Sequence, residues 1–400
     1  MKFCKLSQLT LVSAVSLAVA TLLTACNIVT IDYVFVTSSG GSNGGEIQVY
    51  ATDSESGALR KGANPVDTNG ANPVALAVTP DYQHLYVANF DNDTIVHFTI
   101  AYNGSLTAKD TITLNDAPVA LAVNNAGTYL YVLSGTSSAT LTAYSLSSGT
   151  IGSAVAQQNL VLPSNSGDTL IPTSLNVLTN NNAVYATVYD KSAYNPGGVT
   201  TSTANPGWVF GFSVGSGGSL SAALGSPFKA GVKPSGVVAE PTNNYLYVTD
   251  FASNQMVGYT IQSDGTLNFM FNGPFKTGNQ PTAIAVDPRG KFLYVSNELD
   301  SSVSAYVIDL KTGTPSSAVN TTGSSINSTD TSPVALAVDP ALGRFVFTAN
   351  YLGNSVSGFQ LDPQAGTLKQ TQATPYPTGL KPTAIAIVPH GNHSIQSITP

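Results

Sequence analysis

The most regular feature of the chain is a six-residue segment that begins with proline and alternates small with aliphatic side chains. One copy, residues 73–78, reads Pro-Val-Ala-Leu-Ala-Val, and seven copies recur at spacings of about 45 to 60 residues. The copies begin at Pro73, Pro118, Pro172, Pro234, Pro281, Pro333 and Pro382. A period of two predicts a β-strand, because successive side chains of a strand point to opposite faces.

Each repeat is expected to carry four short strands. After the proline strand, a tight turn such as residues 287–290 leads to an aromatic and β-branched strand such as residues 292–296. A third strand follows, for example residues 302–308, and a glycine-containing turn precedes the fourth. The seven turn glycines are Gly57, Gly104, Gly149, Gly218, Gly265, Gly313 and Gly366. Four strands in a unit of about 45 to 50 residues are typical of one blade of a β-propeller.

The two ends of the repeat array are each short of one strand. Residues 33–36 have no proline strand before them, and the last proline strand, residues 382–387, has no aromatic strand after it. Both deficits vanish if the C-terminal strand joins the N-terminal blade, because two exposed sheet edges are then paired. The sequence therefore predicts an all-β fold over residues 32–389: a seven-bladed β-propeller with four antiparallel strands per blade, closed by its C-terminal strand.

The composition agrees with this fold and narrows the function. Charged residues make up 9 % of the chain, hydrophobic residues 42 %, and 36 residues are glycine. Such a composition suits short strands joined by turns. The formal charge is −7, so no nucleic-acid partner is expected.

The N-terminus carries a short basic start and an apolar stretch over residues 9–23. Residues 23–26, Leu-Thr-Ala-Cys, resemble the lipobox of bacterial lipoproteins. The resemblance implies a signal peptide over residues 1–25, lipidation of Cys26, and a tether over residues 26–31. An ordinary secretory signal with an accidental cysteine is the alternative. The expected location is the bacterial cell envelope, and Asn27 after the cysteine favours the outer membrane, facing the periplasm or the surface.

The second-strand motifs carry a family resemblance. Residues 85–89 read Leu-Tyr-Val-Ala-Asn, residues 246–250 read Leu-Tyr-Val-Thr-Asp, and residues 297–306 read Asn-Glu-Leu-Asp-Ser-Ser-Val-Ser-Ala-Tyr. They resemble the lactonase-type, or YVTN-repeat, seven-bladed propellers, and the last is similar to the 6-phosphogluconolactonase-like branch. The resemblance spans residues 33–389 and implies hydrolysis of a lactone.

The predicted topology gathers the long connections on one face of the disc, named here the loop-rich face. They are residues 157–171, 189–207 and 316–332. The residue after each proline is expected at the central mouth on this face, and none of the seven is ionisable. The resemblance implies basic residues or histidine at such positions, whereas this chain has Ser235 and Thr282 there.

Three ionisable residues remain as catalytic candidates on the loop-rich face. Glu298, in the matched motif, could act as a general base on water, or it could be a rim carboxylate. Lys233 and Lys381 each precede a mouth proline and could neutralise a substrate carboxylate or an oxyanion, or they could be solvated rim charges. Basic residues do not cluster as a phosphate site requires, which disfavours a phosphosugar.

The four histidines suggest no metal site. His84 is expected in a short turn on the opposite face, His97 at a half-exposed strand position, and His390 and His393 in a polar tail over residues 390–400. Residues 91–93, Asp-Asn-Asp, offer oxygen ligands for Ca²⁺ but lack the rest of a calcium loop, so a turn is expected. No cofactor is predicted.

Two functions stay open. In the first, the chain is an envelope-anchored binding or scaffold module that presents the loop-rich face to a protein, a peptidoglycan fragment or a glycan. In the second, it is a periplasmic lactone hydrolase with Glu298 as general base, assisted by Lys233 or Lys381.

Overall fold

The computed structural model describes residues 29–40, 44–62, 64–163, 169–194 and 206–392. The predicted signal peptide, the lipidation site at Cys26 and residues 393–400 of the predicted tail lie outside these ranges. In the part that is described, no helix has the length and apolarity needed to cross a bilayer.

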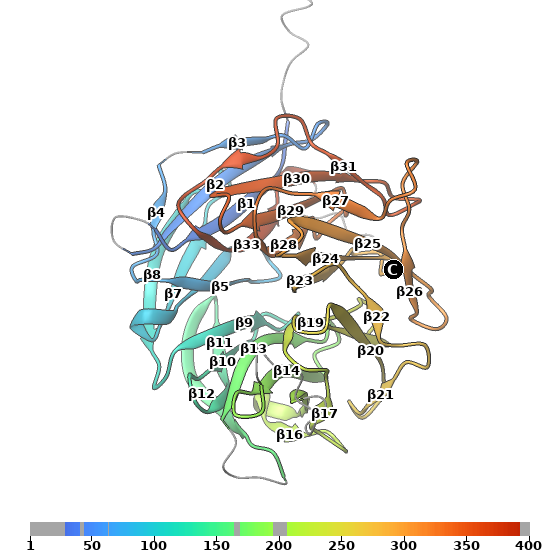
Figure 1. The fold of residues 1–400 in the computed structure, drawn as a ribbon. Coiled ribbons are helices and arrows are strands. Elements are labelled where there is room, and N and C mark those ends of the chain that lie inside the picture. Colours follow the sequence, from blue (N-terminus) through green and yellow to red (C-terminus); the bar gives the residue numbers. More distant parts are fainter. Residues whose placement is uncertain (1–28, 41–43, 63, 164–168, 195–205, 393–400) are drawn as a thin grey trace, which may run out of the picture.

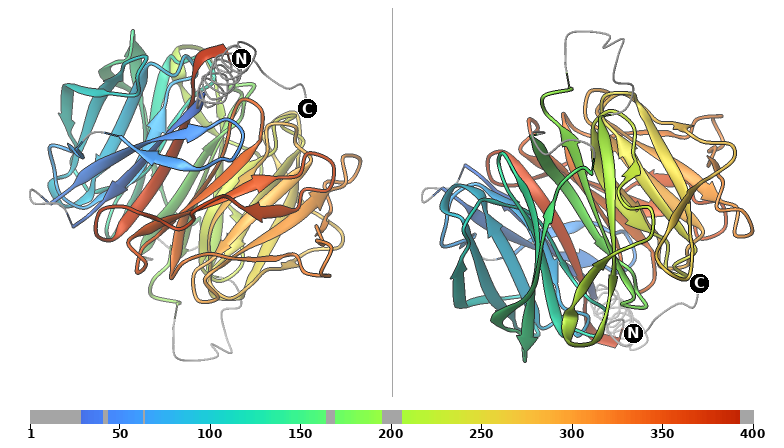
Figure 2. Two further views of the ribbon diagram at one scale, coloured as in Figure 1. Left: turned by 90° about the horizontal axis from the view of Figure 1, so that it is seen from above. Right: turned by 90° about the horizontal axis from the view of Figure 1, so that it is seen from below.

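Seven antiparallel sheets are arranged around a central axis, and neighbouring inner strands contact one another around the whole ring (Figure 1). Views at right angles show the sheets as the blades of a disc (Figure 2). The seven-bladed all-β fold predicted from the repeats is confirmed. Two single-turn 3-10 helices, η1 (Phe90–Asn92) and η2 (Ser216–Gly218), are the helical elements of the described residues.

We number the blades along the ring from the N-terminal sheet. Blade 1 holds β33 (Pro382–Pro389), β1 (Thr30–Ser38), β2 (Glu46–Asp53), β3 (Leu59–Lys61) and β4 (Val66–Asp67). Blade 2 holds β5 (Pro73–Val78), β6 (His84–Asn89), β7 (Thr94–Ile100) and β8 (Leu106–Thr113). Blade 3 holds β9 (Pro118–Val123), β10 (Tyr129–Ser134), β11 (Ala139–Ser147) and β12 (Thr150–Leu160).

The remaining blades follow in chain order. Blade 4 holds β13 (Leu170–Val177), β14 (Ala183–Asp190), β15 (Gly207–Val214), β16 (Leu220–Ala222) and β17 (Phe228–Lys229). Blade 5 holds β18 (Pro234–Ala239), β19 (Tyr245–Asp250), β20 (Gln255–Ile261), β21 (Leu267–Phe269) and β22 (Phe275–Lys276). Blade 6 holds β23 (Pro281–Val286), β24 (Phe292–Asn297), β25 (Ser302–Ile308), β26 (Pro315–Ser317) and β27 (Ile326–Ser328). Blade 7 holds β28 (Pro333–Val338), β29 (Phe345–Asn350), β30 (Ser355–Leu361), β31 (Leu368–Gln370) and β32 (Tyr376–Pro377).

The ring closes within blade 1, as the unmatched terminal strands predicted. β33 pairs antiparallel with β1, and the register sets Val34 opposite Ile387. β1 begins at Thr30, inside the range 26–31 that was expected to be a tether. Closure pairs the edge of β1 that would otherwise be exposed.

The outer strand of five blades is split into two short pieces that pair with the two ends of the third strand. In blade 6, β26 pairs with the end of β25 and β27 pairs with its beginning. The predicted long loop 316–332 therefore contains a paired piece of the blade edge and is not a free connection. In blades 2 and 3 the outer strand is a single element, and the connection predicted from residue 157 starts only after Leu160.

Tyrosines of the second strands join neighbouring blades. Four of them donate their hydroxyl to the carbonyl oxygen of the turn glycine in the next blade, at 2.6 to 2.9 Å. The pairs are Tyr86 with Gly149, Tyr185 with Gly265, Tyr247 with Gly313, and Tyr294 with Gly366. Each of these glycines has a left-handed backbone, which glycine adopts without steric cost.

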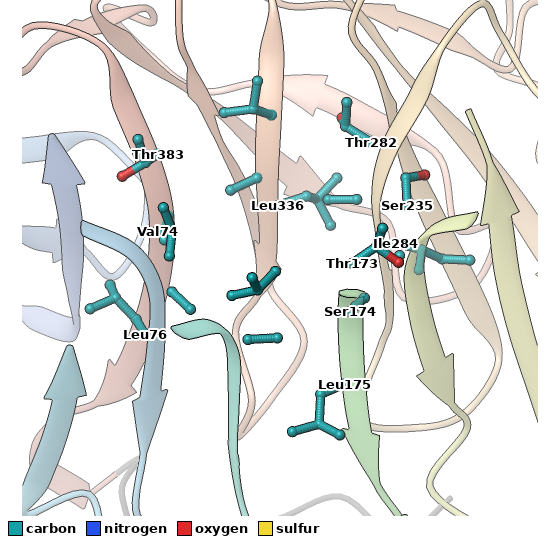
Figure 3. Close-up of a pocket in the computed structure, with 18 of the residues that line it drawn as sticks. Val74, Leu76, Thr173, Ser174, Leu175, Ser235, Thr282, Ile284, Leu336 and Thr383 are labelled. Carbon is teal, nitrogen blue, oxygen red and sulfur yellow. The ribbon is translucent and has the colours of Figure 1, made fainter. Parts of the chain in front are cut away.

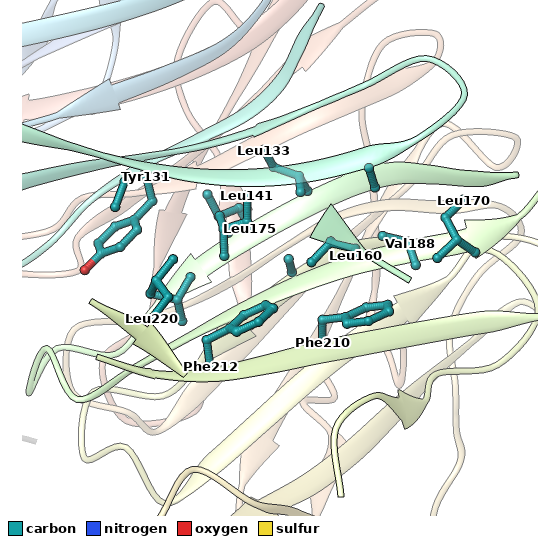
Figure 4. Close-up of a cluster of buried hydrophobic side chains, with 14 of the residues drawn as sticks. Tyr131, Leu133, Leu141, Leu160, Leu170, Leu175, Val188, Phe210, Phe212 and Leu220 are labelled. Carbon is teal, nitrogen blue, oxygen red and sulfur yellow. The ribbon is translucent and has the colours of Figure 1, made fainter. Parts of the chain in front are cut away.

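The hydrophobic core lies between the blades, so each seam is a small core of its own. The largest cluster fills the seam between blades 3 and 4, where Leu133 and Leu141 face Phe210 and Phe212 (Figure 4). Burying such a side chain stabilises a fold by about 1.5–3 kcal/mol. A buried cluster of this kind lies at each seam, so the inner strands that line the mouth stand on packed blades.

Candidate functional site

The central cavity opens among the first residues of the inner strands and has a volume of about 240 Å³. The residue after each proline lines it, as predicted, and Figure 3 shows several of these side chains around the opening. They are Val74, Val119, Thr173, Ser235, Thr282, Val334 and Thr383. No ionisable side chain of the described residues lines this cavity.

Three of the four hydroxyl groups at the mouth join neighbouring blades, whereas Thr173 Oγ1 donates to the Thr187 carbonyl oxygen of its own blade. Ser235 Oγ donates to the carbonyl oxygen of Pro281 at 2.6 Å, and Thr282 Oγ1 donates to that of Pro333 at 2.8 Å. Thr383 Oγ1 of blade 1 donates to the carbonyl oxygen of Pro73 in blade 2 at 2.5 Å. These hydroxyls therefore hold the ring together, and the reactive groups must be sought at the rim.

A repeated backbone contact places side chains on that rim. The residue before the proline accepts, through its carbonyl oxygen, a hydrogen bond from the residue after the second strand. The Phe251 N–H donates to Lys233 O, and the Glu298 N–H donates to Gln280 O, both at 2.9 Å. Lys233 in blade 5 and Glu298 in blade 6 are thus held at the same end of adjacent blades.

Lys233 lies among three aromatic rings. Its ammonium nitrogen is 4.5 Å from the ring centre of Phe251, 5.3 Å from that of Tyr194 and 5.6 Å from that of Tyr189. Burial lowers the pKa of Lys233, and the nearby Glu298 carboxylate opposes that shift. The ring faces stabilise the charged form of the ammonium as well.

Glu298 is half-buried beside this lysine. Ser332 Oγ of blade 7 donates to Glu298 Oε1 at 3.0 Å, which orients the carboxylate. Glu298 and Lys233 interact electrostatically but form no direct ion pair within the described part of the chain. A carboxylate and an ammonium that are close but not paired can both act on a ligand between them.

Lys381 does not join these two residues. It is exposed and precedes the inner strand of blade 1, and blade 7 separates blade 1 from Glu298 in blade 6. The structure therefore brings together two of the three predicted site residues.

The aromatic residues around Lys233 were missed by the sequence analysis. Phe251 follows the second strand of blade 5 as Glu298 follows that of blade 6. Alignment of the repeats could therefore have identified Phe251 as a rim residue. Tyr189 lies near the end of β14 and Tyr194 in the connection that follows it, inside the range 189–207 that was predicted to be a long loop, and the repeat gives no signal for either.

The expectation for two histidines was wrong. His97 is buried, at 2 % exposure, and its Nδ1 lies 2.5 Å from Asp110 Oδ1. His84 is the first residue of β6, and its Nδ1 lies 2.9 Å from His97 Nε2. The pairing of β6 with β7 sets Tyr86 opposite His97, a contact that sequence spacing alone did not reveal.

His390 was expected to lie in a polar tail. Its ring instead packs against the rings of Tyr33 and Tyr102. Asp91 and Asn92 lie in η1, and Asp93 follows with a left-handed backbone. The described residues contain no group of three or more histidine, cysteine or acidic side chains placed to hold a metal ion.

Comparison with known proteins identifies a family and a set of similar folds. The profile of a family described as "Lactonase, 7-bladed beta-propeller" matches residues 43–166 and 219–325, more than half of the chain. No protein of curated function matches the sequence.

Among solved structures, the periplasmic gluconolactonase PpgL of Pseudomonas aeruginosa is 20 % identical, with a TM-score of 0.71 over 90 % of this chain and 99 % of that one. A candidate 6-phosphogluconolactonase of Bacteroides fragilis is 19 % identical, with a TM-score of 0.71 over 90 % of this chain and 98 % of that one. The hydrazine synthase of Kuenenia stuttgartiensis is 17 % identical, with a TM-score of 0.54 over 82 % and 94 %. At these identities the similarities establish the fold alone.

Proposed function

Because this chain belongs to the lactonase family of seven-bladed β-propellers, we propose that it hydrolyses a lactone at the rim of the central cavity, with Glu298 and Lys233 as the reacting groups. The observation that carries the proposal is the pair itself. A half-buried carboxylate and a partly desolvated ammonium are held at adjacent blades, above a cavity whose own lining is neutral. The binding or scaffold function favoured by the sequence alone becomes the second candidate.

The chemistry requires one base and one cation. Glu298 removes a proton from water, and the water oxygen forms a bond to the lactone carbonyl carbon. The carbonyl electron pair moves to its oxygen, and the Lys233 ammonium stabilises that oxyanion. When the oxyanion collapses, the ring carbon–oxygen bond breaks, and the departing oxygen takes the proton from Glu298 to give a hydroxy acid.

The charge at the rim selects the substrate class. A phosphorylated sugar needs several basic groups, whereas one lysine faces one glutamate here, and the cavity below is lined by aliphatic and hydroxyl side chains. We therefore infer a neutral lactone of a sugar or an aryl compound.

The test is turnover of a panel of sugar and aryl lactones by the mature protein, followed as acid release at constant pH. Glu298→Gln and Lys233→Met are each expected to lower kcat by a factor of about 10² or more. Glu55→Gln and Lys311→Met, exposed residues of turns between third and fourth strands, serve as matched controls and keep full activity. Hydrolysis that survives Glu298→Gln, or no hydrolysis of any lactone, refutes the proposal.

The second candidate, a binding module, rests on the neutral cavity and on mouth hydroxyls that already join the blades. It predicts that a neutral glycan or lactone binds the mature protein without being hydrolysed. Calorimetric titration with the same lactones, beside soluble peptidoglycan fragments, separates the two candidates, because binding without acid release supports only the second.

We further propose that Cys26 is lipidated and anchors the propeller in the cell envelope, in the outer membrane. The support is the lipobox-like segment that ends at Cys26 and the similarity to a periplasmic protein. Labelling of cells with a fatty-acid analogue tests this: the full chain takes up label, and Cys26→Ser abolishes the label and moves the protein to the soluble fraction. An unlabelled wild-type chain contradicts the anchor.

A further inference from the structure

A second cavity, of about 360 Å³, lies at the seam between blades 1 and 2 on the face opposite the loop-rich face. Four rings line it, and we name them the aromatic box: Tyr33, Tyr82, Tyr102 and His390. Tyr33 comes from β1, Tyr82 from the turn between β5 and β6, Tyr102 from the turn between β7 and β8, and His390 from the end of β33. None of these residues takes part in the site at the mouth.

Tyr82 has a left-handed backbone at a turn position where five other blades have glycine or asparagine. Six turns between first and second strands close with a hydrogen bond from a residue of left-handed backbone, and in blade 2 that residue is Tyr82, at φ 59°. The five equivalents are Gly127, Asn181, Asn243, Gly290 and Gly343. A bulky side chain at positive φ is strained, and such strain is concentrated at functional sites. The turn therefore holds a tyrosine against its backbone preference.

Tyr102 departs from the repeat as well. It is 79 % exposed, and the sequence has no other aromatic residue in the seven turns between third strand and turn glycine. Its ring is not loose, because its centre lies 4.4 Å from that of His390, which in turn lies 4.9 Å from that of Tyr33. The Tyr102 ring is thus held against blade 1 while most of its surface stays exposed, so it is available to contact a ligand.

The charge of the lining narrows the ligand. Asp81 is the acidic residue of the cavity wall, and no described lysine or arginine lines it. Thr79 Oγ1 and the Gln83 N–H both donate to Asp81 Oδ1, which fixes the carboxylate. Burial lowers the pKa of His390, which disfavours the charged form of its ring. The cavity therefore offers ring faces and a negative charge, which attract a cation and repel an anion.

The same chain shows this chemistry at the mouth. There three rings surround the Lys233 ammonium at 4.5 to 5.6 Å, within the range of cation–π attraction. The aromatic box presents a comparable set of rings with a carboxylate in place of the lysine.

We propose that the aromatic box is a binding site for a small organic cation of the quaternary ammonium class. The ring faces contact the methyl groups of the cation, and Asp81 balances its charge. A neutral sugar, which could also stack on tyrosine, is the competing ligand that the experiment must separate.

The test is titration of the full mature chain with tetramethylammonium chloride, followed by calorimetry or NMR, beside equal titrations with sodium chloride and methyl glucoside. Saturable binding of tetramethylammonium alone is expected. Tyr102→Ala is expected to weaken this binding about five- to thirtyfold, because one aromatic ring no longer attracts the cation. Asp81→Asn should weaken the binding most at low ionic strength, where salt screens the carboxylate least.

Phe271→Ala is the matched control, because Phe271 is a fully exposed aromatic residue of blade 5 that lines neither cavity. This variant keeps the affinity of the wild type. Tyr102 is exposed, so its replacement leaves the Tm unchanged, and thermal melting distinguishes loss of the site from loss of the fold. Binding of methyl glucoside without tetramethylammonium, binding that is unaffected by Tyr102→Ala, or no binding of either compound overturns the proposal.

Discussion

Replacing Tyr247 by phenylalanine tests whether tyrosine hydroxyls hold the seams together. The Tyr247 side chain is completely buried, and its hydroxyl donates to Gly313 O of the next blade at 2.6 Å. The change removes one hydrogen bond and leaves a buried carbonyl oxygen without its partner, which costs about 1–2 kcal/mol. Phenylalanine itself fits the position, since Phe35 and Phe347 stand there in blades 1 and 7.

Tyr131 provides the matched control. It occupies the same position in blade 3, is fully buried, and its hydroxyl has no hydrogen-bond partner among the described residues. Removing a buried hydroxyl that makes no hydrogen bond is neutral or stabilising by up to about 1 kcal/mol.

Urea unfolding followed by tryptophan fluorescence and circular dichroism measures both variants. With an m-value of about 3 kcal/mol per molar or more, Tyr247→Phe is expected to lower the midpoint by a few tenths of a molar. Tyr131→Phe is expected to leave the midpoint unchanged or to raise it. Equal losses in the two variants would refute the argument, because the ring alone would then account for the stability.

Two further predictions follow from the turn glycines and the buried tyrosines. Gly366→Ala sets a Cβ atom 2.2 Å from the Phe292 ring at a φ of 70°. It should therefore lower the Tm far more than Gly323→Ala, where φ is 82° but no atom lies within 4 Å of the new Cβ atom. Equal Tm shifts of the two variants in differential scanning calorimetry would contradict this. Burial raises the pKa of Tyr50 to about 12. The unfolded chain therefore ionises first, stability is fully present below about pH 10, and it declines as the pH rises towards 12, which Tm values at pH 8, 10, 11 and 12 would show; an unchanged Tm across that range would contradict it.

The architecture could be predicted because a propeller repeats the same sequence pattern in every blade. Alternation in the proline strands and the turn glycines recur seven times, so chance departures in one blade do not hide the pattern. Ring closure followed from counting strands at the two ends. The split outer strands were not predicted, because pieces of two or three residues have no periodicity that a sequence can display.

Residues of the candidate site could be predicted only where the repeat fixes their position relative to an inner strand. Glu298 and Lys233 occupy defined positions beside an inner strand, and these positions meet at the mouth. Lys381 occupies an equivalent position, but the place of its blade in the ring separates it from Glu298. Contacts between paired strands, such as that of His84 with His97, can be predicted only when the register of the two strands is known. The sequence pattern does not give that register.

The strand pair that closes blade 1 also governs when the molecule can finish folding. β1 and β33 lie at opposite ends of the chain, so the first blade waits for the last strand to be synthesised. Contacts of such long sequence separation form late, since a long loop must close before they are gained. Until those two strands pair, the sheet of blade 1 lacks its inner strand and the ring stays open.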